Sequence, residues 1–92
     1  MELHQKIIFH ESVFAQCVDE EMILLDMESE NYFGLDEVGA SIWRAMQENE
    51  TLEEVLAVLL EEYDVEEEVL KQDLLHFVTK LKENGLVKVA QA

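Results

Sequence analysis

Three short apolar segments separated by acidic turns occupy the first third of the sequence, and this pattern restricts the fold more than any other feature. Residues 12–18, 22–27 and 32–35 are rich in the aliphatic, β-branched and aromatic side chains that strands prefer. The turns between them, 19–21 and 28–31, contain three and four residues. Turns this short favour antiparallel neighbours, so the sequence predicts a three-stranded antiparallel meander.

The third of these strands, residues 32–35, is expected at an edge of the sheet. The middle strand carries apolar residues on both faces, as a central strand does. An edge strand has unpaired N–H and C=O groups, and a lysine or a proline in the strand usually prevents another chain from pairing with them. Residues 32–35 contain neither. Two interpretations stay open: a helix or the N-terminal residues cover this edge, or a guest peptide pairs with it by strand addition.

Three helices are predicted after the strands, because each segment follows a capping residue and then repeats apolar residues at helical spacing. The helices and their caps are roughly 37–47 with Asp36, 52–63 with the Thr51–Glu54 capping box, and 66–84 with Asp64. Asn84-Gly85 is expected to end the third helix, and residues 86–89 form a last short strand.

The predicted fold class is therefore α+β and winged-helix-like: a three-stranded antiparallel sheet followed by three helices and a short C-terminal strand. The 92 residues contain no proline and no linker-like segment. We expect one domain, residues 1–92, with residues 1–11 as a flexible arm.

The third predicted helix carries more apolar surface than one core contact needs. The side expected to face the core consists of Leu70, Leu74, Phe77 and Leu81. The adjacent flank alternates aliphatic and lysine side chains and consists of Lys71, Leu75, Val78 and Lys82. Two interpretations stay open here as well. The aliphatic residues widen the core contact while the lysines suit a helix C-terminus, or the flank faces an acidic, amphipathic peptide.

The charge and the cysteine content indicate which classes of partner and which cellular compartment to expect. With 6 basic and 22 acidic residues, the net charge is −16, so a nucleic acid partner is not expected. Residues 71–92 hold 4 basic and 2 acidic residues and form the region expected to attract an acidic partner. The single cysteine, Cys17, cannot pair within the chain, and no signal peptide or membrane span is visible. We expect a cytoplasmic protein without a membrane partner.

No catalytic or metal-binding pattern stands out. His4, His10 and His76 lack the spacing of zinc ligands. The acidic clusters lack the alternating ligands and the glycine of a calcium loop. The serines lack the Asp-Ser-Leu context of a phosphopantetheine carrier. We therefore expect that the protein is not an enzyme, needs no cofactor or metal, and works by binding another polypeptide.

The order of these segments resembles the PqqD family, the coenzyme PQQ synthesis protein D-like domains, also called RiPP precursor peptide recognition elements. The residues that carry the resemblance are Met22-Ile23-Leu24-Leu25-Asp26, Tyr32 through Trp43, Thr51-Leu52-Glu53-Glu54-Val55 and Val69 through Val87. They match the family's Leu-Asn-x-x-Gly-x-x-Ile-Trp, Thr-x-x-Glu-Ile and Leu-x-x-x-Gly-Leu-Val segments over about residues 12–89. Asp36 stands where asparagine is usual, and both residues cap helices.

The resemblance implies a non-catalytic peptide chaperone that binds the leader of a ribosomally synthesised precursor peptide. In the family the leader adds as a strand beside the third strand and lies against the third helix. It is presented to a modifying enzyme, often a radical SAM enzyme, in PQQ-type or related pathways. Carried over by position, the peptide-binding residues are Tyr32, Phe33, Gly34 and Leu35 on the strand and Lys71, Leu75, Val78 and Lys82 on the helix.

Two alternatives remain beside this expectation. The first is a winged-helix regulator that binds DNA, which the charge of −16 argues against. The second is a structural oligomerisation module in which the exposed strand edge pairs with a second copy as a homodimer. Strands that are apolar on both faces and the Ile7-Ile8-Phe9 segment are consistent with that alternative.

Overall fold

The structure is a computed structural model that describes residues 2–90. The elements follow in the order β1 (Lys6–Phe9), β2 (Val13–Val18), β3 (Glu21–Asp26), β4 (Tyr32–Leu35), α1 (Glu37–Glu48), α2 (Leu52–Glu62), α3 (Glu67–Glu83) and β5 (Val87–Ala90). Every strand and helix expected from the sequence is present, with ends within one residue of the predicted bounds. The α+β prediction of a three-stranded antiparallel sheet, three helices and a C-terminal strand is confirmed.

Lys6–Phe9 forms a strand, β1, within the segment 1–11 that the sequence analysis expected as a flexible arm. β1 pairs antiparallel with β5, and the register runs from Lys6 opposite Ala90 to Phe9 opposite Val87. The carbonyl oxygens of Leu3 and Gln5 accept hydrogen bonds from the first N–H groups of α2, at 2.8 and 3.1 Å. These bonds satisfy donors that a helix N-terminus leaves free. The N-terminal residues therefore cover the start of α2 and not β4.

The sheet has the order β2-β3-β4, so β3 is central and β4 is an edge. Burial alternates along β3, because successive side chains point to opposite faces. Met22, Leu24 and Asp26 are buried on the inner face, while Ile23 and Leu25 are exposed on the outer face. In the part of the chain that the structure describes, α1 contacts the inner face and the outer face meets solvent.

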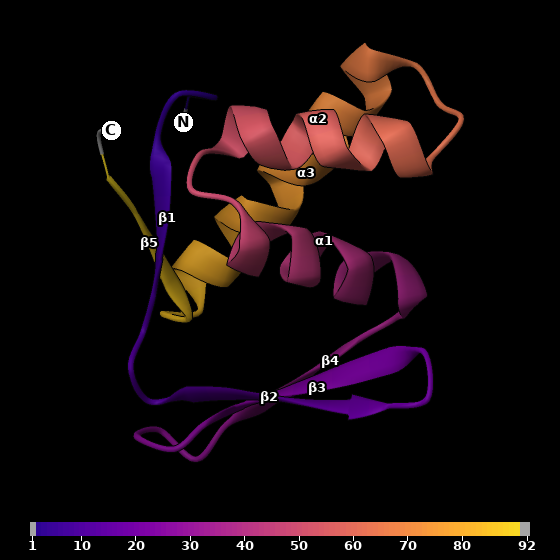
Figure 1. The fold of residues 1–92 in the computed structure, drawn as a ribbon. Helices are drawn as coiled ribbons and strands as arrows, with labels where there is room; N and C mark the ends of the chain where they lie inside the picture. The colour runs from indigo at the N-terminus through magenta and orange to yellow at the C-terminus, as the bar shows by residue number, and fades with distance from the viewer. Residues whose placement is uncertain (1, 91–92) are drawn as a thin grey trace.

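Helix α1 lies between the sheet and α2, as Figure 1 shows, and joins the two halves of the core. Its predicted cap is confirmed, since Asp36 Oδ1 accepts a hydrogen bond from the Gly39 N–H at 2.8 Å. Trp43 is almost fully buried and packs edge-on against Phe9 of β1, with ring centroids 4.8 Å apart. An aromatic pair of this kind adds to the area it buries, so Trp43 also ties the β1–β5 pair to the core.

The ends of α2 and α3 follow local sequence signals with one exception. Both hydrogen bonds of the Thr51–Glu54 capping box are present. Helix α3 instead begins after Glu66, which makes no side-chain capping bond, so the prediction that Asp64 caps this helix is wrong. Asp64 lies two residues too early to reach the free N–H groups. The C-terminal stop is as expected, and Gly85 adopts a φ of +75°, which suits a residue without a Cβ.

Candidate functional site

Strand β4 presents unpaired backbone groups along the edge of the sheet. The Asp26 N–H donates to the Asn31 carbonyl at 2.9 Å, so the backbone carbonyl of Asn31 faces β3. Along an antiparallel strand, the backbone groups of successive residues face alternately toward one neighbouring strand and away from it. Tyr32 and Gly34 therefore point their N–H and C=O groups outward, while the other two residues of β4 pair with β3. Within residues 2–90, no further strand pairs with this edge.

A groove of about 540 Å³ runs beside this edge, between β4, the start of α1 and α3. Its lining consists of Gly34, Leu35, Asp36, Val38, Gly39, Ile42, Asp73, His76, Phe77 and Lys80. Apolar side chains from all three elements meet there with a carboxylate at Asp73 and an ammonium group at Lys80, which lie about two turns apart on α3. A concave apolar surface with a few charged groups is suited to hold the side chains of a peptide.

Gly39 allows the three elements of the groove to approach one another. A Cβ at this position would lie 3.3 Å from the Cβ of Leu35 and 3.4 Å from Cε2 of Phe77. At 3.3 Å, Leu35 would have to shift by a few tenths of an ångström, while 3.4 Å to Phe77 leaves no room for a larger side chain. The glycine thus lets the first turn of α1 pack closely between β4 and α3, which brings Phe77 next to the strand edge.

The four strand residues predicted to bind a peptide all lie in β4. Gly34 and Leu35 line the groove. Phe33 is half-buried on the inner face, and Tyr32 is 75% exposed on the outer face. The strand half of the predicted set is therefore gathered at one edge, with side chains on both of its faces.

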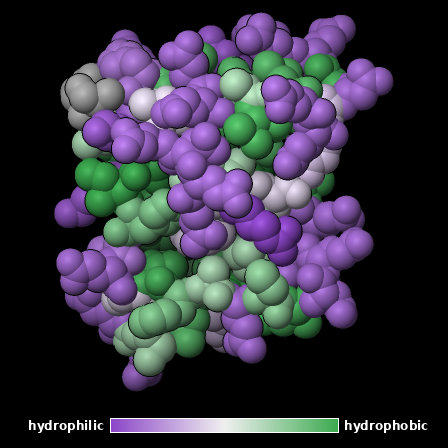
Figure 2. Space-filling view, in the orientation of Figure 1, coloured by the Kyte–Doolittle hydropathy of each residue, from purple (hydrophilic) through white to green (hydrophobic). Residues whose placement is uncertain are grey.

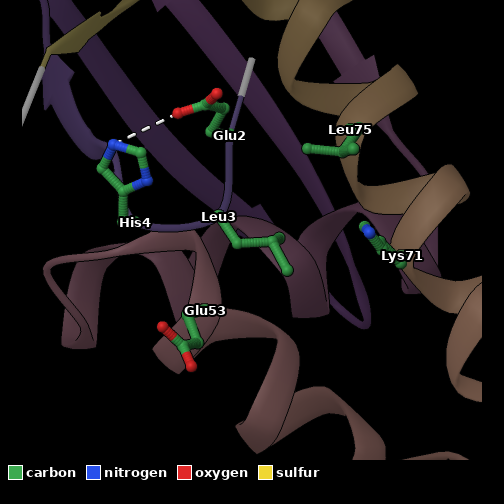
Figure 3. A pocket seen from close by; sticks show the side chains of 6 residues that line it. All are labelled: Glu2, Leu3, His4, Glu53, Lys71 and Leu75. Carbon is green, nitrogen blue, oxygen red and sulfur yellow. Dashed lines mark ion pairs between the residues drawn. The ribbon is translucent and has the colours of Figure 1, made fainter.

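The four helix residues predicted with them do not line this groove as the structure describes it. Lys71 and Leu75 line a different hollow, and Figure 3 shows both on the side of α3 that faces the N-terminal segment. Val78 is fully buried in the core instead of lying on a surface flank, and Lys82 is exposed. The other residues around the hollow in Figure 3 are Glu2, His4 and Glu53.

Lys71 and Leu75 lie on a different flank of α3 from the helix residues that line the groove beside β4. The buried side of this helix includes Leu74, and a surface flank lies on either side of it. Lys71 and Leu75 belong to one flank, whereas Asp73, Phe77 and Lys80 belong to the other. Helical periodicity identifies the buried side but does not distinguish the two flanks. Helical spacing predicted Phe77 on the core side of this helix, and in the structure Phe77 packs against the core and also lines the groove.

Asp26, at the end of β3, is a buried carboxylate held by serine hydroxyl groups. Ser12 Oγ donates to Oδ1 at 2.6 Å, and Ser29 Oγ donates to Oδ2 at 2.8 Å. His10 Nδ1 lies 2.7 Å from Ser12 Oγ. Ser12 therefore lies between His10 and Asp26 in this hydrogen-bonded chain, whereas in a catalytic triad the histidine lies between the other two residues and accepts the serine proton. The cluster instead ties the segment before β2 to the turn between β3 and β4.

Replacement of Asp26 by asparagine is expected to destabilise the fold in a pH-dependent way. Hydrogen bonds from Ser12 and then from Ser29 lower the pKa of Asp26 below 3.8, against the opposing effect of burial. Since the pKa is lower in the folded state, this group contributes stability above pH 3.8 that is lost as the pH falls through the folded pKa.

Urea unfolding of the parent and of Asp26→Asn should therefore show a difference in midpoint at neutral pH that shrinks below about pH 4. Asp64→Asn, at an exposed position, is the matched control. A difference that stays constant over the whole pH range would show that the charge of Asp26 does not contribute.

Within residues 2–90, no group of three or more His, Cys, Asp and Glu side chains is arranged to hold a metal ion. None of the helices described is long and apolar enough to cross a membrane.

Known proteins similar to this chain include a family and two solved structures. Residues 21–87 match the family described as Coenzyme PQQ synthesis protein D (PqqD). A structure described as "TbiB1 in Complex with the TbiA(beta) Leader Peptide" is 31% identical with a TM-score of 0.83, over 88% of this chain and 94% of that chain. A structure described as "Lasso peptide synthetase B1 complexed with the leader peptide" is 29% identical with a TM-score of 0.81, over 90% and 98%. No curated protein sequence matches the chain.

Proposed function

The chain belongs to the PqqD family, and from that premise we propose that it binds the leader of a ribosomally synthesised precursor peptide by adding it as a strand to β4. The observation that carries the proposal is the row of outward N–H and C=O groups of Tyr32 and Gly34 beside an apolar groove. Two similar proteins, TbiB1 and a lasso peptide synthetase B1, were solved with leader peptides bound, which supports a peptide partner for this chain.

A guest strand on this edge would use its two faces differently. Its side chains alternate in direction, so every second residue would face the groove near Phe77 and the others would lie on the outer face of the sheet. About four backbone bonds at ~1 kcal/mol each, with one or two apolar anchors, are consistent with about micromolar affinity.

The groove carries charges of both signs, with Asp73 and Lys80 on the same helix. We therefore propose an amphipathic leader with mixed charge, instead of the acidic leader expected from Lys71 and Lys82. Opposite charges on the guest would set its direction and register more than its affinity.

We assign the protein a non-catalytic role, in which it presents the bound leader to a modifying enzyme such as a radical SAM enzyme of a PQQ-type or related pathway. One peptide-binding domain suffices for this role. The single cysteine, which cannot pair within the chain, supports action in the reducing environment of the cytoplasm.

A nuclear magnetic resonance titration with the leader peptide encoded near the gene tests the proposal. The largest shifts are expected at the amides of residues 32–35 and at Asp73, His76, Phe77 and Lys80. A scrambled leader of the same composition is the control and should leave these resonances unchanged. Shifts centred on residues 2–4, Lys71 and Leu75 would place the peptide on the opposite flank of α3, and no shifts at all would refute leader binding.

A further inference from the structure

The outer face of the sheet carries an apolar patch that no described element covers. Cross-strand pairing places Phe14, Leu25 and Tyr32 in one row across the three strands, with Ile23 in the next row. Their exposed fractions are 61%, 37%, 75% and 39% in that order. Figure 2 shows apolar side chains gathered at the lower end of the molecule, where Figure 1 places the sheet. These four residues are called the outer patch below.

The core does not account for the outer patch. The inner face of β3 already buries Met22 and Leu24 beneath α1, so the sheet has a complete hydrophobic side without the residues of its outer face. A strand that needs only one buried face usually alternates with polar residues. A contiguous exposed patch of large apolar side chains instead marks a surface that another molecule covers.

The charges around the outer patch define the chemistry of its partner. Residues 11–37 contain nine acidic residues and no lysine or arginine. Acidic turns flank the sheet at both ends, with Asp19 and Glu20 at one end and Glu28 and Glu30 at the other. A second copy docked on this face would bring these like charges together. A surface with an apolar centre and a rim of lysine and arginine would complement them.

We propose that the outer patch is the docking surface for the enzyme that modifies the bound peptide, through an apolar area on that enzyme framed by basic residues. The inference rests on the proposed function, because a guest strand on β4 extends this same sheet. Its outward side chains would stand beside Tyr32 and Gly34, next to the docked enzyme. Leader residues that face the groove bind the leader to this chain. Leader residues that face outward form, together with the outer patch, the surface that contacts the enzyme.

This arrangement couples the two binding events. If the enzyme contacts the outer patch and the guest strand together, the leader raises the affinity for the enzyme, and the enzyme raises the affinity for the leader by the same factor. Alanine substitutions at alternate leader positions should then separate into two classes. One class weakens binding to this chain, and the other weakens only the assembly with the enzyme.

The test is isothermal titration calorimetry with the modifying enzyme and the leader encoded beside this chain, measured separately and together. The Phe14→Thr/Leu25→Thr double variant removes the centre of the outer patch while keeping residues that strands accept. Affinity for the enzyme should fall at least about tenfold, and affinity for the leader should change less than about twofold. The control is Val65→Thr/Val69→Thr, two apolar residues of 48% and 50% exposure outside the sheet.

Each result has a defined meaning once thermal melts show that the double variant is folded. Unchanged affinity for the enzyme, or an enzyme that does not bind the parent, overturns the docking proposal. Sedimentation that shows a dimer of the parent but not of the variant, with enzyme binding unaffected, assigns the outer patch to a second copy instead. An enzyme affinity that depends on Phe14 and Leu25 when the leader does not bind the parent upholds the docking surface and refutes the proposed leader site.

Discussion

A Gly34→Pro variant is expected to bind the leader peptide at least about 30-fold more weakly than the parent while keeping its fold. Proline removes the N–H that Gly34 directs outward, and its ring occupies the space where a guest carbonyl would approach. The pairing of β4 with β3 does not use this N–H, and edge strands tolerate proline on their solvent side. Proline abolishes the bond donated by the Gly34 N–H, and its ring also displaces the guest from the Gly34 carbonyl; the loss of these two ladder bonds at about 1 kcal/mol each accounts for the expected factor.

Gly34→Ala is the matched control for this prediction. A Cβ at Gly34 meets no other atom within 4 Å, so alanine fits and the N–H is retained. We expect its affinity to stay within about threefold of the parent. Fluorescence anisotropy with a labelled leader measures both variants, and thermal melts verify that they are folded. Equal losses in both variants would indicate a steric effect of side-chain volume, and parental affinity in Gly34→Pro would exclude strand addition at β4.

Phe77→Ala is expected to weaken leader binding by about tenfold or more, because the ring is the large aromatic group of the groove. Burial of an apolar side chain of this size against a guest is worth about 1.5–3 kcal/mol when complete, and part of the ring is already buried in the free protein. The variant enlarges the groove without changing its charge, so the loss should lie mainly in the dissociation rate.

Leu75→Ala provides the comparison that decides between the two flanks of α3. Leu75 is also half-buried against the core and lies two residues earlier on the same helix, so its replacement should cost comparable stability. We expect its leader affinity to change less than about twofold, since it faces the N-terminal segment and not β4. The opposite outcome, a loss in Leu75→Ala and none in Phe77→Ala, would support the flank expected from the sequence.

The sequence did not predict β1, and the reason differs from the one that leaves the flank of α3 open. The segment Ile7-Ile8-Phe9 is apolar, but its partner β5 lies at the opposite end of the chain. A short strand that is not part of a hairpin contains no local sequence pattern that indicates which other strand it pairs with. Pairing between distant strands depends on the whole core bringing the two ends together.

The exposure of the outer patch was likewise invisible in the sequence. Residues 22–27 are apolar on both faces, which correctly identified β3 as central. The same pattern occurs when helices cover both faces of a sheet. Only the arrangement of α1 on the inner face shows that Ile23 and Leu25 are uncovered.

The sequence by itself determined the order, ends and pairing of β2, β3 and β4 and the extent of the helices, because turns, caps and periodicity act over a few residues. It also placed Tyr32 and Gly34 on an edge strand. Tertiary structure alone decided that the N-terminal residues leave this edge open and that the Asp73–Lys80 flank of α3 faces it. Both outcomes depend on how distant elements pack around one core, and no local pattern records that packing.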